Sequence, residues 1–366
     1  MAVAQFLFTG QIAPDPAVGE DVGAQAHSVI SQLALALAER ELVLGDLLRL
    51  RLFVRDLGEL PRIEEAIDRH ALGRPAMSVV ELPPADAAEP GVAVTLDAVA
   101  AAGAGEQRGL GPNSVRLGPW VFLGAVPATD PRALFAQMEE LLRAQGARLR
   151  DVVKVGGWLT FPMADYGPLG ETRSALVGEA GLLPASAAVQ VGRVGSRGER
   201  LAFEAIAFAP EERDKEAGHE ATSRLADFYV DARAAGWYVF TSGEVPDGRG
   251  SAAEQAREIY ERLRAHLVAH GATPTDVLQQ TVFVRAGGDG RNSVAAGDGN
   301  SGGYGDGTVA GAIVTEAARA FYGAGATLPP TTLLPVADFG FQPGCAIEIE
   351  LVARATAADG RAGDAG

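Results

Sequence analysis

Trp237-Tyr238-Val239-Phe240-Thr241-Ser242-Gly243 begins the stretch that decides the fold of this 366-residue chain. Aromatic and β-branched residues closed by a glycine are typical of a strand. An amphipathic helix is predicted from Ser251 to His270, because apolar residues recur there at steps of three and four. Ser251 is placed to cap that helix and Gly271 to end it. A second strand over 280–284 completes a strand–helix–strand unit.

The same unit occurs twice earlier in the chain. Its opening strand, which we call the landmark strand, corresponds to residues 6–10 and 120–124. Each copy also closes with an alternating strand, at 94–99, 202–207 and 347–352. Three matching features in one order, three times over, predict tandem repeats. The alternative is a single α/β domain whose strands resemble one another by chance.

The expected repeats cover residues 1–101, 111–210 and 225–355, with small or charged linkers between them. The first repeat lacks the strand that precedes the landmark strand in the other two. The third repeat carries a glycine-rich insertion at 286–311 that has no counterpart elsewhere. This insertion is either a flexible surface loop or a lid, in which Tyr304 is the bulky group able to cover a pocket. Its aspartates do not have the spacing of an EF-hand calcium loop.

Composition limits the classes of function. The net charge of −16 argues against partners made of nucleic acid and against anionic membrane surfaces. No apolar run approaches the roughly 20 residues that cross a bilayer, and the N-terminus does not resemble a secretory signal. The only cysteine, Cys345, excludes an internal disulfide and is compatible with a reducing compartment. We therefore expect a cytoplasmic protein that acts on a small molecule.

The last strand indicates how the repeats assemble. Ile347, Ile349 and Leu351 share one face, which packs under the helices of the repeat. Glu348 and Glu350 share the other face, which must pack against something other than the helices of its own repeat. Three such sheets turned toward one another around a pseudo-threefold axis would satisfy these faces and leave clefts between the repeats.

Several segments resemble the RidA family, also called YjgF/YER057c/UK114. They include the Thr-Ser-Gly end of the strand at 241–243, Thr-Val-Phe-Val at 281–284 and Ile-Glu-Ile-Glu at 347–350. Phe8-Thr9-Gly10-Gln11-Ile12 and Arg74-Pro75-Ala76-Met77-Ser78 add similar segments in the first repeat. The resemblance implies a chorismate-mutase-like α+β fold. Because the family forms homotrimers with sites at subunit interfaces, it also implies an intramolecular pseudo-trimer that is a monomer or a dimer.

The resemblance places the family's functional residues unevenly. In that family an arginine holds the substrate carboxylate and a glutamate positions or activates water. The arginine position falls on Met77, Ser186 and Thr331, and the glutamate position falls on Thr95, Ala202 and Glu348. The serine of the landmark strand falls on Thr9, Leu123 and Ser242, and a helix asparagine falls on Glu64, Gly170 and Thr315. Arg193, Arg197 and Arg285 are candidates to replace the lost arginine.

The third repeat keeps Glu348, Ser242 and Tyr229, which we expect to be catalytic. The residues expected to bind substrate are Thr331, Thr315, Tyr304 and Cys345. Each has a plainer interpretation: a turn cap for Ser242, a core residue for Tyr229 and a solvated strand residue for Glu348. A glutamate in a water-poor cleft would have a raised pKa and would serve as general acid or base.

Three functions stay open. The first is a RidA-like hydrolase, deaminase or lyase that acts on a small carboxylate-bearing enamine, imine or enol ether, as part of a biosynthetic pathway. The second follows from a looser similarity of the segment around Cys345 and Glu348 to chorismatases, which hydrolyse an enol ether. The third is a non-catalytic ligand-binding or scaffold protein. No cofactor and no metal are expected, since His266 and His270 share a helical face without the zincin spacing.

Overall fold

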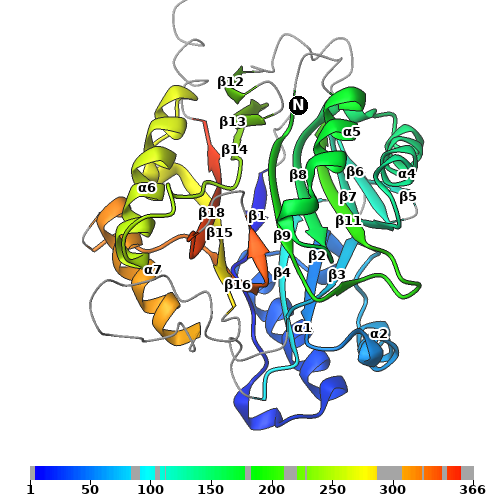
Figure 1. The fold of residues 1–366 in the computed structure, drawn as a ribbon. Helices are drawn as coiled ribbons and strands as arrows, with labels where there is room; N and C mark the ends of the chain where they lie inside the picture. The colour runs from blue at the N-terminus through cyan, green and yellow to red at the C-terminus, as the bar shows by residue number, and fades with distance from the viewer. Residues whose placement is uncertain are drawn as a thin grey trace, which may run out of the picture.

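The structure is a computed structural model of the chain. It describes residues 5–83, 91–103, 108–111, 113–177, 183–209, 221–226, 229–286, 307–323, 325–339 and 344–355. These residues form an α+β architecture with three mixed sheets. In Figure 1 the helices lie at the periphery and the strands lie toward the middle of the molecule.

The first sheet has the strand order β1-β4-β2-β3-β10. Its strands are β1 (Phe6–Phe8), β2 (Leu47–Val54), β3 (Ala76–Glu81), β4 (Val94–Ala101) and β10 (Arg193–Val194). Strand β2 pairs antiparallel with β4 and parallel with β3. Helices α1 (Val22–Ala38) and α2 (Leu60–Asp68) bury their apolar faces against this sheet.

The second sheet repeats this plan with the order β17-β9-β8-β11-β7-β6-β5. Its strands are β5 (Arg108–Gly111), β6 (Ser114–Leu117), β7 (Trp120–Ala128), β8 (Val152–Leu159), β9 (Ala185–Gln190), β11 (Leu201–Phe208) and β17 (Asp338–Phe339). Strand β8 pairs antiparallel with β11 and parallel with β9. The helices of this repeat are α4 (Pro131–Ala144) and α5 (Gly167–Val177).

The third sheet has the order β12-β13-β14-β18-β15-β16. Its strands are β12 (Ala221–Ala226), β13 (Tyr229–Ala235), β14 (Tyr238–Thr241), β15 (Val277–Arg285), β16 (Thr331–Val336) and β18 (Ile347–Arg354). Strand β15 pairs antiparallel with β18 and parallel with β16. Helices α6 (Ala252–Ala269) and α7 (Gly307–Tyr322) complete it. The three sheets therefore fit three tandem repeats.

The exact repeat boundaries stay a prediction, and two strands begin ahead of them. Strand β5 begins at Arg108, ahead of the expected start of the second repeat at 111. Strand β12 begins at Ala221, ahead of the expected start of the third repeat at 225. Helix α7 begins at Gly307, so the end of the predicted insertion at 286–311 is helical. Residues 287–306 of that insertion, Tyr304 included, lie outside the described residues.

A short capped turn before the second strand explains one recurring sequence feature. Each repeat has a 3-10 turn whose aspartate accepts the backbone N–H of the residue three positions earlier. The aspartates are Asp46, Asp151 and Asp276, at donor–acceptor distances of 3.0, 2.8 and 2.8 Å. This local hydrogen bond fixes the entry into β2, β8 and β15.

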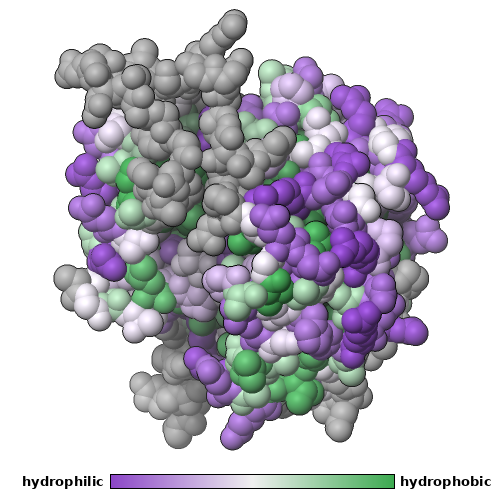
Figure 2. Space-filling model, turned by 90° about the horizontal axis from the view of Figure 1, so that it is seen from below, coloured by the Kyte–Doolittle hydropathy of each residue, from purple (hydrophilic) through white to green (hydrophobic). Residues whose placement is uncertain are grey.

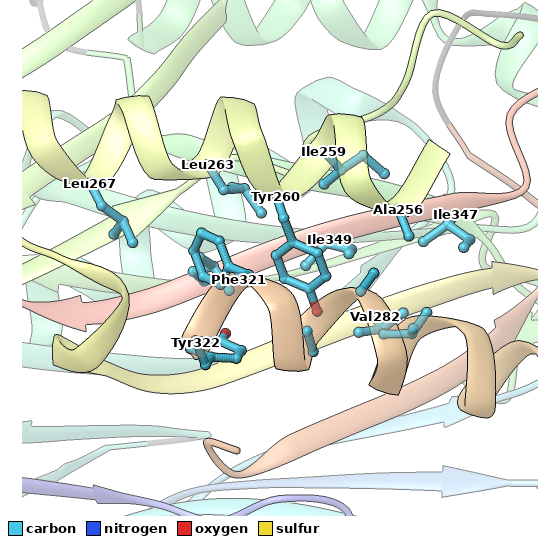
Figure 3. Close-up of a cluster of buried hydrophobic side chains, with 14 of the residues drawn as sticks. Ala256, Ile259, Tyr260, Leu263, Leu267, Val282, Phe321, Tyr322, Ile347 and Ile349 are labelled. Atoms are coloured by element: carbon cyan, nitrogen blue, oxygen red, sulfur yellow. The ribbon is translucent and has the colours of Figure 1, made fainter. Parts of the chain in front are cut away.

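Helix α6 shows how the sequence pattern builds the core. Ser251 caps the helix and forms a capping box with Glu254, and Gly271 leaves it at a φ of +72°. Figure 3 shows the apolar stripe of α6 facing α7 and the sheet. The stripe consists of Ala256, Ile259, Leu263 and Leu267, all 0% exposed. Each buried leucine or isoleucine contributes about 1.5–3 kcal/mol to folding.

The aromatic residues of the landmark strands meet where the three sheets join. Phe6 of β1 stacks on Tyr238 of β14 at 4.9 Å between ring centroids and lies edge-on to Trp120 of β7 at 5.4 Å. The Tyr238 hydroxyl also accepts the Phe6 backbone N–H at 2.9 Å. The aromatic character of these strands thus reflects contact between repeats as well as strand propensity.

The contacts between repeats follow a cyclic order. Strand β10 of the second repeat pairs with β3 of the first, and β17 of the third pairs with β9 of the second. Buried side chains follow the same order: Ser78 donates to Glu204 at 2.6 Å, and Thr332 donates to Asp97 at 2.8 Å. This cyclic order is what a pseudo-trimer requires, although the threefold symmetry itself stays a prediction.

The described surface is mixed in character. The face in Figure 2 shows extensive hydrophilic areas with smaller hydrophobic areas between them. Among the described helices, none is both long and apolar enough to span a bilayer.

Candidate functional site

The best candidate site lies at the junction between the second and third repeats. Two hydrogen bonds join the repeats at this junction, and a third fixes Ser242 within its own repeat. Ser186 of β9 donates its N–H to the Ser242 hydroxyl at 2.8 Å, and Gly243 donates its N–H to the Ser186 carbonyl at 2.9 Å. The Ser242 hydroxyl in turn donates to the Val230 carbonyl at 2.5 Å. Ser242 is therefore a positioning residue in this structure, since its hydroxyl is fully engaged with backbone groups.

Glu348 lies beside this junction on β18. The side chain is 3% exposed, and among the described residues no group donates a hydrogen bond to its carboxylate. Its neighbours in sequence, Ile347 and Ile349, belong to the core under α6 and α7, so Glu348 faces the opposite side of the sheet. The prediction that the last strand divides into an apolar and a carboxylate-bearing face is confirmed.

Burial is the main reason why the Glu348 carboxyl is a weaker acid than an ordinary glutamate. It raises the pKa of the carboxyl well above the usual value of 4.5, and the nearby carboxylates of Glu350 and Glu244 raise it further. The Lys154 ammonium acts in the opposite direction. Lys154 is itself held by Glu350 at 2.5 Å and by the Thr241 carbonyl at 2.8 Å. Because Glu350 already neutralises this ammonium, Glu348 keeps a raised pKa.

Gly243 makes room for the Glu348 carboxyl group. A Cβ at this position would overlap Glu348 Oε1. The carboxyl therefore rests directly over the backbone at the end of the landmark strand, where only a residue without a side chain fits.

A buried arginine faces the same junction from the second repeat. Arg173 of α5 is 5% exposed, and its Nη1 donates to the Ser186 hydroxyl at 3.0 Å. Its guanidinium lies 6.0 Å from the centre of the Tyr166 ring. Burial raises the pKa of the Tyr166 hydroxyl, while the charge of Arg173 lowers it and that of Glu348 raises it. The Tyr166 hydroxyl thus senses the charges of both Arg173 and Glu348.

Arg173 was not among the arginines predicted to replace the family's clamp. Ser186 occupies the family's arginine position in the second repeat, and Arg173 brings a guanidinium to it from the neighbouring helix. The available signal was spacing: Leu169 and Arg173 are one helical turn apart, so Arg173 falls on the same inward face as a buried leucine. An arginine on an inward helical face is unusual enough to mark a site.

The arginines that were predicted have other partners or positions. Arg193 pairs with Asp56 and Glu81 of the first repeat, both at 2.6 Å. Arg285 pairs with Asp338 at 2.7 Å and donates to the Cys345 carbonyl. Arg197 is exposed. These contacts assign Arg193 and Arg285 to structure.

The structure divides the expected substrate-binding residues between two places. The Thr331 carbonyl accepts the Gln11 N–H at 2.9 Å, which places Thr331 at the junction of the third and first repeats. Thr315 lies on α7, on the helix-covered face of the third sheet, whereas Glu348 is on the other face. The structure therefore does not bring Thr331 and Thr315 together with Glu348, and their role in binding stays a prediction.

The remaining predicted residues lie nearer to Glu348 or have no described side chain. Cys345 is buried, its thiol donates to the Pro246 carbonyl at 3.3 Å, and burial raises its pKa to about 11. A thiol of this kind is a small core residue, since its thiolate is disfavoured at neutral pH. Tyr229 is the first residue of β13, next to the Val230 carbonyl that binds Ser242, and its side chain lies outside the described part.

Comparisons with known proteins agree with this architecture. No family model matches the sequence. Over 99 residues the chain is 35% identical to Protein DfrA of Myxococcus xanthus, a match that spans 26% of this chain and 73% of DfrA. A crystal structure of chorismatase is similar with a TM-score of 0.53 at 14% identity, covering 84% of this chain and 93% of chorismatase. The chain therefore shares the fold of that structure.

The chain belongs to the RidA (YjgF/YER057c/UK114) family, in the form of three tandem repeats. Rv2704 of Mycobacterium tuberculosis, a member of that family, matches at 25% identity over 26% of this chain and 84% of its own, with a TM-score of 0.24.

Proposed function

We propose that the chain is a hydrolase of small carboxylate-bearing enamines, imines or enol ethers, with one site at the junction of the second and third repeats. One observation carries the proposal: no group among the described residues donates a hydrogen bond to the buried Glu348 carboxyl, and Tyr166 senses both this carboxyl and the buried guanidinium of Arg173. A proton donor next to an anion clamp is the pair of groups that this chemistry needs.

The proposed steps begin with binding. Arg173 donates hydrogen bonds to the substrate carboxylate, which orients the electron-rich double bond toward Glu348. Glu348, neutral because of its raised pKa, transfers its proton to the carbon at the far end of that double bond. The carbon that bears nitrogen or oxygen becomes an iminium or oxocarbenium ion.

Water then adds to that cationic carbon while the Glu348 carboxylate removes a proton from the water. The resulting carbinolamine or hemiacetal collapses to a carbonyl compound and releases an amine or an alcohol. An imine substrate enters at the water-addition step. Glu348 recovers its proton in each cycle, so it acts as acid and base in turn.

Within this class of substrates, the proposal favours an enol ether. The likeness to the chorismatase structure extends over most of both lengths, and therefore over more than one repeat. The alternative is a ligand-binding protein in which Arg173 holds a carboxylate and Glu348 transfers no proton.

Glu348→Gln separates these functions. Glutamine keeps the size of the side chain but carries no transferable proton, so turnover of an enolpyruvyl ether or an enamine carboxylate should fall by about 100-fold or more. Binding of the substrate carboxylate, measured by calorimetry, should change little. Far-ultraviolet circular dichroism and thermal unfolding report whether the fold is intact.

Two outcomes would contradict the proposal. Turnover retained by a folded Glu348→Gln variant would exclude Glu348 as the proton donor. Absence of turnover by the unaltered chain across enamine, imine and enol-ether carboxylates, with binding retained, would favour the ligand-binding alternative.

A further inference from the structure

A groove of about 720 Å³ lies on the second repeat between α4 and α5, apart from the junction site. Arg132, Arg148 and Arg150 line it, together with Phe135, Leu149 and Leu176. Its volume is in the range typical of sites for small organic ligands. The small side chains of Ala136 and Ala175 help to make the hollow, because they leave space between the two helices.

The charge of this groove contrasts with that of the whole chain. The net charge of the protein is −16, yet the groove lining carries three arginines. Within the described residues Arg132 and Arg148 form no ion pair, and Arg150 is 3.9 Å from Asp151. The lining residue Glu139 is already bound by Arg143 at 2.6 Å and by the Leu149 N–H at 2.8 Å. Positive charge is therefore left over for a ligand.

The floor of the groove is apolar. Phe135 lies at its base, and Leu176 is 49% exposed at its rim. Leu176 is one of only four large apolar side chains exposed in the described part of the chain. Inorganic phosphate would satisfy the arginines but would leave this floor uncovered. An anion with a flat apolar body would satisfy both, because guanidinium groups bind carboxylates in pairs of hydrogen bonds.

We propose that this groove binds a small aromatic carboxylate, with Arg132 and Arg148 holding the carboxylate and the apolar floor covering the ring. The proposal does not rest on the function proposed for the junction. The two sites are nevertheless joined by α5, which presents Thr172 and Leu176 to the groove and Arg173 to the junction.

Calorimetric titration with 2-naphthoate tests the proposal on the full chain. The unaltered chain should bind one equivalent, and 2-naphthalenemethanol, which has the same ring system but no charge, should bind at least about tenfold more weakly. The double variant Arg132→Gln/Arg148→Gln should lose at least about tenfold in affinity for 2-naphthoate. Leu176→Ser should weaken binding of both compounds.

Matched controls use two exposed arginines of the first repeat. Arg62 and Arg69 are each paired with acidic side chains on and around α2, so Arg62→Gln/Arg69→Gln removes the same charge and should leave the affinity unchanged. All these side chains are exposed, so we expect every variant to fold; thermal unfolding checks this.

Three results would overturn the proposal. The first is no heat of binding at millimolar 2-naphthoate. The second is unchanged affinity in the Arg132→Gln/Arg148→Gln variant, which would place the probe elsewhere, such as at Arg173. The third is a dimer of the unaltered chain in analytical ultracentrifugation that is absent in the double variant, together with no binding of 2-naphthoate. This result would assign the groove to contact with a second copy of the chain.

Discussion

The three junctions between repeats differ in what lies over the glycine that ends each landmark strand. At the second–third junction the Glu348 carboxyl lies over Gly243. At the first–second junction the Asn113 side chain and the Met77 backbone lie over Gly124. At the third–first junction the Thr331 backbone approaches Gly10, so a Cβ there would meet its N and O atoms at 2.8 and 2.9 Å. The same position thus meets a carboxyl at one junction and backbone or amide atoms at the other two.

Neutral amides complete the two packed junctions. The Asn113 amide accepts the Met77 N–H at 2.6 Å and donates to the Ala125 carbonyl at 3.0 Å. The Gln11 amide donates to Thr95 at 3.0 Å and accepts the Leu333 N–H at 3.1 Å. A satisfied amide has no proton to transfer and no charge to offer a ligand. The comparison therefore teaches that hydrogen bonds of neutral amides complete two junctions, whereas at the third no group in the described part of the chain donates to the Glu348 carboxyl.

The largest expected effect comes from changing each of these glycines to alanine. In Gly243→Ala the new methyl group displaces the end of a flexible side chain, so the chain should fold while turnover falls by about 100-fold. In Gly124→Ala the methyl group meets the fixed Met77 backbone, so the free energy of unfolding should fall by about 1–3 kcal/mol instead. Turnover and urea unfolding of both variants provide the measurements.

Gly10→Ala extends that test to the third junction. It also meets backbone atoms, so it should resemble Gly124→Ala in losing stability and keeping turnover per folded molecule. A Gly243→Ala variant with full turnover, or a Gly10→Ala variant that loses turnover while keeping its stability, would remove the distinction between the junctions.

Arg173→Lys tests the group that we propose to hold the substrate carboxylate, and its expected effect on turnover is smaller. Lysine keeps the charge but not the forked donors, so KM should rise by about tenfold while kcat changes less. Arg193→Lys is the matched control, because Arg193 serves a structural ion pair at the first–second junction. A KM that rises equally in both variants would show that general charge, and no particular clamp, holds the substrate.

Most of the fold could be predicted from the sequence because the same pattern of strands and helices occurs in all three repeats. The aromatic landmark strands, the capped turn at Asp276 and the alternation around Glu348 are local patterns with a direct physical cause. The face that Glu348 presents also followed from strand alternation, since Ile347 and Ile349 had to be in the core.

The composition of the site could be predicted only in part, because a site shared by two repeats depends on their order in space. Sequence comparison proposed Glu348 and Ser242 as site residues, a role that stays a prediction, and grouped them with Thr331 of their own repeat. The partner is Ser186 of the preceding repeat, and no local pattern records that pairing. Arg173 was missed for a related reason, because it reaches Ser186 from a helix and does not stand at the strand position that the resemblance matched to an arginine.

The raised pKa of Glu348 predicts a cost in stability that the other junctions do not have. Below the unfolded-state pKa near 4.5 the carboxyl is neutral in both states and destabilises nothing. As the pH rises through the raised folded-state pKa, stability is lost by about 1.4 kcal/mol for each unit by which the pKa is raised. Glu348→Gln should therefore unfold at a higher temperature than the unaltered chain near pH 8 and at a similar one near pH 4.

Glu254→Gln is the control for this pH dependence, because its sign is opposite. The Ser251 N–H lowers the pKa of the Glu254 carboxyl, so its contribution is present above pH 4.5 and is lost as the pH falls. Melting temperatures measured from pH 4 to pH 9 compare the two variants. If Glu348→Gln melts below the unaltered chain at pH 8, then Glu348 is an ordinary paired carboxylate and the contrast with the amide-filled junctions disappears.

The smallest expected effect concerns Gln11, the amide at the third–first junction. Gln11→Ala removes two hydrogen bonds and leaves the Leu333 N–H without its acceptor, so the free energy of unfolding should fall by about 1–2 kcal/mol. Gln32→Ala, which removes a more exposed glutamine bonded to the Ala13 carbonyl, should cost about 0.5 kcal/mol or less. Urea unfolding measures both changes.

Turnover and ligand stoichiometry decide what the Gln11 result means. If Gln11 only fills space, then Gln11→Ala should keep full turnover and one substrate-binding equivalent per chain at the junctions, because Thr95 in the opened space has no acidic proton to replace that of Glu348. A second equivalent of substrate bound by this variant would show that the amide occupies a site that still recognises the ligand. Loss of turnover would instead show that the third–first junction contributes to catalysis, and the division of the three junctions into one working and two packed would then be wrong.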